Sequence, residues 1–335
     1  MLEKPDLPDE RLINCLLREF GLSVSSASFL PLGADVNTAV YRADCLDGSA
    51  WFVKLRSGTF DAVTVQVPHL LRVDLGIAQV IPPQPRLTGD LWARLDEYAV
   101  VLYPYVEGEN GFERQMSNQN WIDLGQTLSA LHSASLPEDV LQLLPRETFA
   151  SHWRERVVRF QTLVEDETFS NSEAEQAAAL LRDNRDEITD LVARTTRLAE
   201  AVAGRILEFV PCHADIHAGN VLIDGDGRLH VVDWDTLCLA PKERDLMFIG
   251  AGIGGVWTRE EELALFQQGY GPAIVDADAI AYYRFERILV DIVEYCDQLL
   301  LTDEGGDDRE QSLGHLASNF GRDGLIEFTL ALDRA

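Results

Sequence analysis

One segment constrains the fold more than any other, residues 209–235, FVPCHADIHAGNVLIDGDGRLHVVDWD. Two apolar runs in it flank Asp-Gly-Asp-Gly at 224–227. This combination predicts two short strands joined by a tight turn, because glycine tolerates positive φ and aspartate starts turns. Such a hairpin brings the loop before its first strand close to the end of its second strand. The sequence therefore predicts that Asp215, Asn220 and Asp233 gather around one point.

These three side chains suit phosphoryl transfer from ATP. A carboxylate must orient the attacking hydroxyl and take its proton, and Asp215 fits this role. Mg²⁺ prefers oxygen ligands, and the oxygens of Asn220 and Asp233 fit this second role. Positioning and charge neutralisation then provide most of the catalysis. ATP and Mg²⁺ are the predicted cofactors.

An alternative interpretation of the same segment is a metal hydrolase. The run HADIH at 213–217 offers the ligand pattern His-x-Asp-x-His, with His213, Asp215 and His217 as its members. No further cluster of His and Asp with ligand spacing completes such a site in the sequence. The phosphoryl-transfer interpretation therefore comes first.

Two segments upstream are candidates for nucleotide binding. Residues 29–43 read as strand, turn and strand, and the turn, which contains Gly33 and Asn37, would cover phosphates with backbone N–H groups. Residues 50–55, AWFVKL, alternate as a strand on which Lys54 could reach the phosphates as a point charge. An ordinary hairpin and a solvated edge lysine remain alternatives for these segments.

The partner of Lys54 is less obvious. The stretch 56–80 contains no Glu and offers only Asp61 and Asp74 as acidic partners, of which Asp61 is the expected one. Pro68 should interrupt any long helix there.

Strands at 92–95 and 98–103 precede Pro104-Tyr105-Val106-Glu107-Gly108, which we interpret as a hinge. The Pro104 carbonyl and the Val106 N–H would face the adenine edge. An ordinary connection between a strand and a helix is the alternative.

Composition excludes several classes of protein. Asp and Glu number 56 against 28 Lys and Arg, giving a net charge of −28. This argues against a nucleic-acid partner and favours a small cationic substrate, although acidity also simply keeps proteins in solution. Five scattered cysteines without a CxxC indicate neither a disulfide framework nor a zinc site, which favours the cytoplasm. No signal peptide or membrane span is expected, and the oligomeric state stays open.

The rest of the sequence is mainly helical. The periodicity predicts helices at 8–20, 259–269, 276–302 and 309–333. A further helix should begin near residue 117, with Ser117 or Asn118 as N-cap. An inserted helical hairpin is expected at about 147–203. Asp245, at the start of a further helix, could hold the catalytic loop by hydrogen bonds. Alternatively, it is an ordinary carboxylate at a helix start, where the helix dipole stabilises negative charge.

The helix at 276–302 carries Glu286, Asp291 and Glu294. Asp291 and Glu294 are three residues apart and share a face, which would bind the ammonium groups of a cationic substrate. A solvated face is the alternative.

The motifs together resemble a known family. H213-A-D215-I-H217-A-G-N220, D233-W-D235, Lys54 on its strand and LYPYVEG at 102–108 resemble the aminoglycoside phosphotransferases. Within that family the chain looks most like the spectinomycin phosphotransferases, through CHADIHAGNVL, APKERDLMFIG and RFERILVDI.

The resemblance implies an α+β, two-lobed, protein-kinase-like fold. A small N-lobe with an antiparallel sheet would span residues 1–103, a hinge 104–108, and a larger, mainly helical C-lobe 109–335.

The resemblance also implies roles for individual residues. Asp215 would be the catalytic base, and Asn220 and Asp233 the Mg²⁺ ligands. Lys54 would bind phosphates, while His213 and Asp235 would support the site. The chain would phosphorylate a hydroxyl of an aminocyclitol antibiotic, with spectinomycin as the first candidate. A kinase of choline, homoserine or a thiosugar, and a non-catalytic nucleotide-binding relative, are the alternatives.

Overall fold

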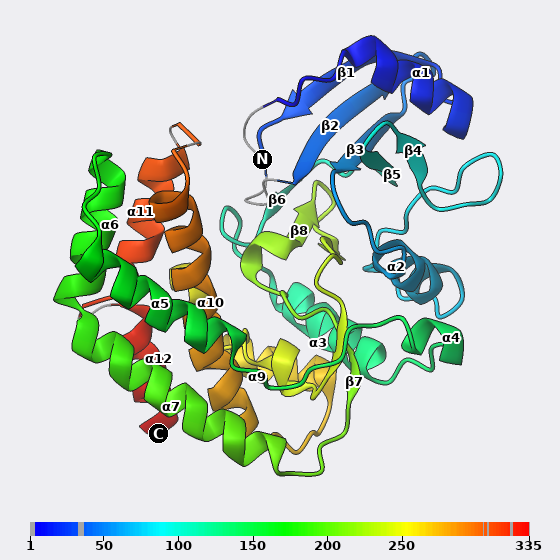
Figure 1. Ribbon diagram of the computed structural model, residues 1–335. Coiled ribbons are helices and arrows are strands. Elements are labelled where there is room, and N and C mark those ends of the chain that lie inside the picture. Colours follow the sequence, from blue (N-terminus) through cyan, green and yellow to red (C-terminus); the bar gives the residue numbers. More distant parts are fainter. Residues whose placement is uncertain (1–3, 33–36, 304, 307, 322–323, 335) are drawn as a thin grey trace. The chain divides into compact units, whose positions relative to one another are not determined.

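The computed structural model describes residues 4–32, 37–303, 305–306, 308–321 and 324–334 (Figure 1). Gly33, expected in a phosphate-binding turn, lies outside the described residues.

The chain forms two compact units. The first consists of residues 1–145, 216–237 and 268–270, and the second of residues 146–215, 238–267 and 271–335. The proposed hinge at 104–108 lies within the first unit, and the lobe boundary there stays a prediction.

A five-stranded antiparallel sheet dominates the first unit, with the strand order β1-β2-β3-β5-β4. Its strands are β1 (Val24–Leu30), β2 (Thr38–Cys45), β3 (Ala50–Arg56), β4 (Ala93–Leu95) and β5 (Tyr98–Pro104). Helix α1 (Asp9–Phe20) packs against the sheet (Figure 1), and its buried Leu12 and Leu16 share a core with Val53 and Leu55 of β3. Because side chains alternate along a strand, Lys54 points to the face of the sheet opposite that core.

A second, three-stranded sheet in the first unit carries the hairpin predicted from the sequence. It has the order β6-β8-β9, with β6 (Gly108–Asn110), β8 (Val221–Asp224) and β9 (Leu229–Val231). Gly227 in the turn has a φ of 80°, which explains why glycine is suitable there. The short helix η1 (Ala218–Asn220) leads directly into β8.

Three helices complete the first unit: α2 (Val63–Val73), α3 (Asn118–His132) and α4 (Glu138–Leu141). Ser117 is the N-cap of α3 and forms a capping box with Asn120. Helix α2 continues through Pro68, because a proline in its second turn removes a single backbone hydrogen bond from a short helix.

Helices dominate the second unit. They are α5 (His152–Asp166), α6 (Ser172–Asp183), α7 (Arg185–Ala203), α8 (Glu243–Leu246), α9 (Glu260–Tyr270, of which residues 268–270 belong to the first unit), α10 (Ala277–Leu301), α11 (Asp308–Ala317) and α12 (Leu325–Arg334), with the short helix η2 (Ile253–Gly255). Helix α10 is central, because its buried Phe285, Ile288 and Ile292 join the core shared with α5, α6 and α7. Strands β7 (Val210–Cys212) and β10 (Cys238–Ala240) form a small antiparallel pair.

The structure corrects two helix predictions. The segment expected as a helical hairpin at 147–203 contains three helices, because Asn184 ends α6 and α7 begins at the next residue. The helix expected at 309–333 is divided into α11 and α12. Gly321 between them has a φ of 88°, and a Cβ on Gly324 would lie 2.6 Å from the Asn319 carbonyl oxygen, so the backbone turns there.

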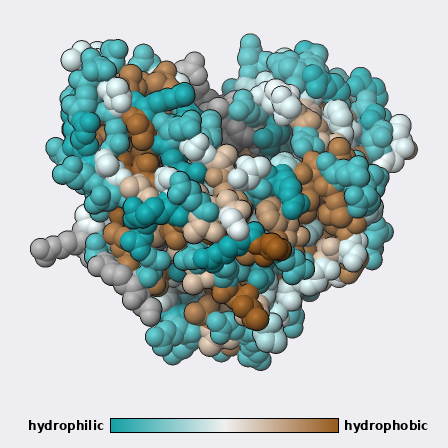
Figure 2. Space-filling model, turned by 60° about the horizontal axis from the view of Figure 1, so that its bottom comes forward, coloured by the Kyte–Doolittle hydropathy of each residue, from teal (hydrophilic) through white to brown (hydrophobic). Residues whose placement is uncertain are grey.

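The α+β class is confirmed, with an antiparallel sheet in the N-terminal region and a helical C-terminal part. The face drawn in Figure 2 is mostly hydrophilic, with apolar side chains in separate patches. Among the described residues, no helix combines the length and apolar character that crossing a membrane requires.

Candidate active site

The first unit brings Lys54 together with both carboxylates of the D-x-D pair. Its Nζ lies 2.8 Å from Asp233 Oδ1 and 2.7 Å from Asp235 Oδ2. Arg56, two residues further along β3 and on the same face, also pairs with Asp235. Burial opposes the positive charge, but the two carboxylates raise the pKa of Lys54 above its usual value, so the ammonium stays charged.

The β8–β9 hairpin positions the D-x-D pair relative to Asn220. The Val232 N–H donates to the Asn220 carbonyl oxygen at 3.0 Å, one residue before Asp233. Asp233 then adopts a left-handed backbone, with a φ of 62°. Trp234 is buried, and its Nε1 donates to the Val231 carbonyl oxygen at 3.2 Å, which anchors the turn. The hairpin therefore places Asn220 and Asp233 on adjacent backbone.

Asn220 itself is buried beside His217. The Asn220 Nδ2 lies 3.4 Å from His217 Nε2, and His217 Nδ1 accepts the Gly219 N–H at 3.0 Å. The imidazole also stacks on Phe112, with ring centroids 5.9 Å apart. A Cβ on Gly219 would lie 2.7 Å from His217 Cε1, so glycine permits this close packing.

The remaining nucleotide-binding candidates also lie in the first unit. The Asn37 carbonyl oxygen accepts the Ser57 N–H at 2.9 Å, which joins the phosphate-loop segment to the end of β3. Pro104 is the last residue of β5, and Val106 follows it half-buried. Their roles toward adenine and phosphate stay predictions.

Asp61 was the expected partner of Lys54, and this expectation is wrong. The Asp61 Oδ1 accepts the Val63 N–H at 3.1 Å, so this carboxylate binds the backbone where α2 begins. Lys54 pairs with the two aspartates of the hairpin instead.

In the second unit, Asp245 holds the segment that leads to Asp215. Its Oδ2 accepts the His213 N–H at 2.9 Å, and its Oδ1 accepts the Ala214 N–H at 2.6 Å. Asp245 and His213 are fully buried, and Ala214 has a φ of 67°. Two backbone N–H groups that donate to one carboxylate therefore fix an unusual backbone immediately before Asp215.

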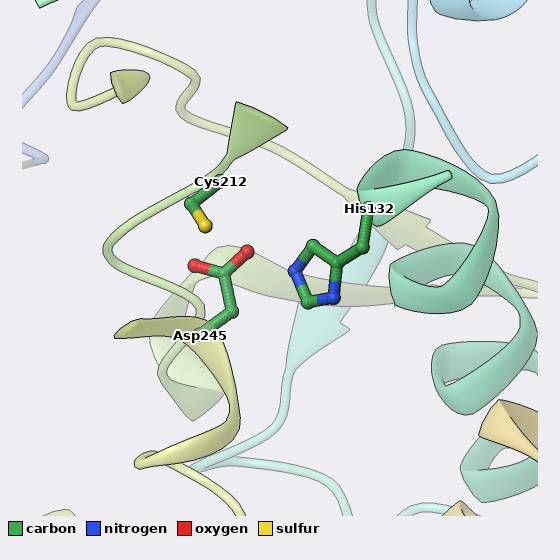
Figure 3. A group of neighbouring side chains, drawn as sticks. All are labelled: His132, Cys212 and Asp245. Atoms are coloured by element: carbon green, nitrogen blue, oxygen red, sulfur yellow. The ribbon is translucent and has the colours of Figure 1, made fainter. Parts of the chain in front are cut away.

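The Cys212 thiol lies next to the Asp245 carboxylate (Figure 3). Burial raises the pKa of Cys212 well above its usual value, and the negative charge of Asp245 adds to this. Its Sγ lies 3.6 Å from the carbonyl oxygens of Ala240 and Pro241. Cys212 is therefore a protonated packing residue beside the catalytic segment.

Asp215 pairs with an arginine that the sequence analysis did not identify. Arg287 Nη1 lies 2.6 Å from Asp215 Oδ1. Arg287 Nε also lies 2.9 Å from Asp291 Oδ1, an ion contact without the alignment of a hydrogen bond. Burial opposes its charge, but Asp291 and Asp215 raise the pKa of Arg287, so the guanidinium stays charged.

The three acidic residues expected to bind ammonium groups differ in environment. Glu286 is buried and pairs with Arg154 at 3.3 Å, and burial raises the pKa of its carboxyl to about 7. Asp291 contacts Arg287, and Glu294 is exposed. A cationic ligand would therefore compete with an arginine at Glu286 and at Asp291, while ammonium binding by these residues stays a prediction.

The predicted residues fall into one cluster in each unit. The first unit contains Lys54, Asn220, Asp233 and Asp235, and the second contains His213, Asp215, Asp245 and Asp291. The meeting of Asp215, Asn220 and Asp233 at one point stays a prediction.

The sequence-based prediction did not include two members of these clusters, Arg56 and Arg287. Arg56 lies two residues from Lys54 on a strand, and Arg287 lies four residues before Asp291 on a helix. Both spacings place side chains on one face, so this signal was present in the sequence.

Comparison with known proteins identifies the family. Residues 29–285 match the family described as "Phosphotransferase enzyme family". The chain belongs to this family. It is 32% identical to spectinomycin phosphotransferase APH(9)-Ia, solved in complex with ADP and spectinomycin, with a TM-score of 0.92. The superposition covers 99% of this chain and 100% of that protein, which confirms the protein-kinase-like fold. The chain is thus a phosphotransferase, and its kinase chemistry takes an alcohol group as acceptor.

Two further similarities are more distant. Choline kinase LicA from Streptococcus pneumoniae is 16% identical, with a TM-score of 0.55 over 92% of this chain and 98% of that protein. "Protein ACTIVITY OF BC1 COMPLEX KINASE 3, chloroplastic" from Arabidopsis thaliana is 25% identical over 253 residues, which are 73% of this chain. The chain spans 32% of the length of that curated relative.

The donor set suits a magnesium–nucleotide complex. Asp233 offers a carboxylate and Asn220 an amide oxygen, and both are hard ligands of the kind that Mg²⁺ prefers. Asp233 is half exposed, with a side-chain exposure of 50%, so its carboxylate is accessible to a ligand. Lys54, already close to this carboxylate, adds a positive charge that suits phosphate.

Proposed function

We propose that this protein transfers the γ-phosphoryl group of ATP to a hydroxyl of a cationic aminocyclitol antibiotic, with spectinomycin as the first candidate, and thereby confers resistance. The observation that carries the proposal is the full-length similarity to APH(9)-Ia, at 32% identity. The net charge of −28 suits a cationic substrate, because an acidic surface concentrates cations.

Asp215 is the proposed catalytic base. Its carboxylate accepts a hydrogen bond from the acceptor hydroxyl, orients its oxygen toward the γ-phosphorus and takes the proton as the bond forms. Asp245 supports this role by fixing the backbone of His213 and Ala214.

The proposed nucleotide site uses the first unit. Lys54 binds the α- and β-phosphates, Asn37 belongs to the loop over the phosphates, and Pro104 and Val106 bind adenine through their backbone. Asn220 and Asp233 would hold Mg²⁺, which when bound neutralises charge on the β- and γ-phosphates. Asp235 keeps Lys54 and Arg56 in place.

The proposed substrate contacts lie on α10. Glu294 is exposed, while Asp291 and Glu286 contribute negative charge that arginines partly neutralise. Ammonium groups of the substrate would bind along this acidic face.

A substrate panel with coupled detection of ADP tests this proposal. The purified protein, ATP and Mg²⁺ are combined with spectinomycin, with other aminocyclitols and aminoglycosides, and with choline, homoserine and a thiosugar. We expect ADP release with spectinomycin and one added phosphate by mass spectrometry. The Asp215→Ala variant is the control for contaminating kinases.

A metabolite kinase is the second candidate, because the choline kinase LicA shares the fold. Turnover of choline or another metabolite without turnover of spectinomycin would reject the antibiotic and keep the reaction. Nucleotide binding without ADP release by any alcohol would favour a non-catalytic relative. The metal hydrolase loses support, because His213 and His217 both engage backbone N–H groups of their own loop.

A further inference from the structure

Arg287 contacts Asp215, and the proposed function does not use this contact. It lies on α10, far along the chain from the catalytic segment, and its Nη1 lies 2.6 Å from Asp215 Oδ1. Its side chain is 20% exposed and that of Asp215 is 22% exposed, so this ion pair is largely shielded from water. A shielded pair between an arginine and a carboxylate is stronger and better oriented than one on the open surface.

Helix α10 gives Arg287 a rigid base. The adjacent residues Ile288 and Leu289 are fully buried in the core of the second unit. Asp291, one turn further along the helix, contacts Arg287 Nε at 2.9 Å. The guanidinium is therefore anchored both through its own helix and by a second carboxylate.

The same helix also contacts the residues that follow α8. Arg284, one turn before Arg287, donates to the carbonyl oxygens of Met247 and Ile249, each at 3.2 Å. These residues directly follow α8, which carries Asp245. Helix α10 thus contacts the segment that carries Asp245 through Arg284 and contacts Asp215 itself through Arg287.

We propose that Arg287 is a positioning residue for Asp215. Anchored by Asp291, the guanidinium binds Oδ1 of Asp215 and thereby sets the direction in which the carboxylate meets the acceptor hydroxyl. This inference rests on the proposed function, because it assigns Asp215 the role of catalytic base. It also means that Asp291 acts mainly as the anchor of Arg287.

The geometry requires an arginine. A guanidinium is a planar fork that can contact two carboxylates with different nitrogens, whereas a lysine ammonium is a compact point charge on a flexible stem. Replacement by lysine keeps the charge but loses the rigid spacing between the two nitrogens that contact Asp215 and Asp291. The two substitutions Arg287→Ala and Arg287→Lys therefore separate charge from geometry.

The first experiment measures kcat and KM for the acceptor that the panel identifies. We expect Arg287→Ala to lower kcat about 100-fold, since a small misplacement of a catalytic group has an effect of that order, with KM for the acceptor nearly unchanged. Arg287→Lys should recover only a small part of the loss, and guanidinium added to Arg287→Ala should restore more activity than ammonium does. Asp291→Asn should lower kcat less than Arg287→Ala.

Arg156→Ala is the matched control. Arg156 on α5 pairs with Asp297 on the same helix α10, and both side chains are about as exposed as those of the Arg287 pair, at 28% and 33%. We expect this variant to keep wild-type kcat. Thermal unfolding of every variant verifies that the protein remains folded.

Two outcomes would overturn the inference. A folded Arg287→Ala variant with kcat close to that of wild type would show that Asp215 needs no positioning. A lower KM for the acceptor with unchanged kcat would show that Arg287 merely competes with the cationic substrate.

A second experiment needs no acceptor and therefore separates this inference from the proposed function. Unfolding is measured for Arg287→Ala, Asp215→Ala and the double variant. We expect the double variant to lose less stability than the sum of the single variants, which would demonstrate the pairing. Additive losses would reject it, whether or not any alcohol is phosphorylated. An inactive wild type in the panel, together with coupled losses, would reject only the proposed reaction.

Discussion

The two candidate clusters share an arrangement of charges but differ in chemistry. In the first unit Lys54 lies between Asp233 and Asp235, and in the second Arg287 lies between Asp215 and Asp291. In both, one cation contacts two carboxylates. The Asp233 side chain is 50% exposed, whereas those of Asp215 and Asp291 are 22% and 11% exposed.

This difference indicates different uses of an ion pair. Lysine is a point charge that can exchange one oxygen partner for another. The exposed Asp233 can likewise exchange one cation for another, so the first cluster suits a ligand that enters and leaves. The nitrogens of an arginine side chain have fixed positions relative to one another, so the second cluster suits a carboxylate whose direction must not change.

The largest expected effect follows from removing the carboxylate of the second cluster. Asp215→Ala should lower kcat by about 10³-fold, in the range typical of a lost general base, because the acceptor hydroxyl loses its proton acceptor. Nucleotide affinity should stay near that of wild type, measured by titration calorimetry. Near-normal turnover would show that Asp215 is not the base.

Removing the exposed carboxylate of the first cluster should weaken the binding of the nucleotide with Mg²⁺. Asp233→Ala should abolish the Mg²⁺-dependent part of nucleotide binding, because a carboxylate ligand is lost. Titration with ATP in the presence of Mg²⁺ and of EDTA measures this part directly. An unchanged response to Mg²⁺ would contradict the assignment of Asp233 as a ligand.

Removing the cation of the first cluster should have a smaller effect. Lys54→Ala should weaken ATP binding about tenfold to a hundredfold, the equivalent of one or two charged hydrogen bonds. KM for ATP and the affinity for ADP measure the effect. Arg56→Ala is a useful comparison, since Arg56 also pairs with Asp235 but is not assigned to phosphate, and an equal loss there would reject a specific role for Lys54.

The smallest expected effect concerns Glu286, a buried carboxylate outside both clusters. Burial raises the pKa of Glu286 to about 7, so the folded protein binds this proton more tightly than the unfolded chain does. The stabilisation is present at low pH and is lost as the pH rises from about 4.5 to about 7. Glu286→Gln cannot ionise and should reduce this decline by at most about 3 kcal/mol.

Urea unfolding at about pH 5 and about pH 8 measures this decline in both proteins. An identical change in unfolding free energy for wild type and Glu286→Gln would mean that Glu286 is already ionised in the folded state at about pH 5.

The local features of the sequence predicted most of the fold. The alternation in AWFVKL, the turn at 224–227 and the apolar stripe after Ser117 each correspond to an observed element. Each depends on residues close together in the chain, which is why periodicity and turn chemistry suffice. The break between α11 and α12 was missed, because it depends on Gly321 and on the close packing of Gly324 against Asn319.

The motif residues of the candidate site were predicted from the sequence, but their ion-pair partners were predicted only in part. Asp215, Asn220 and Asp233 are marked by a spacing that can be read along the chain. Asp233, one of the two partners of Lys54, lies 179 residues away from it in sequence, and Arg287 lies 72 residues from Asp215, so no local pattern links these groups. On α10, Arg287 lies between Glu286 and Asp291, two of the acidic residues from which the cation site was predicted.

The left-handed backbone of Ala214 has a consequence for selection experiments. An alanine with a φ of 67° stores about 1 kcal/mol of strain that glycine would release. A screen for thermostability alone would therefore enrich Ala214→Gly, which leaves Asp245 with the same backbone partners but loosens the peptide before Asp215. At this position, heat resistance and turnover would be selected in opposite directions.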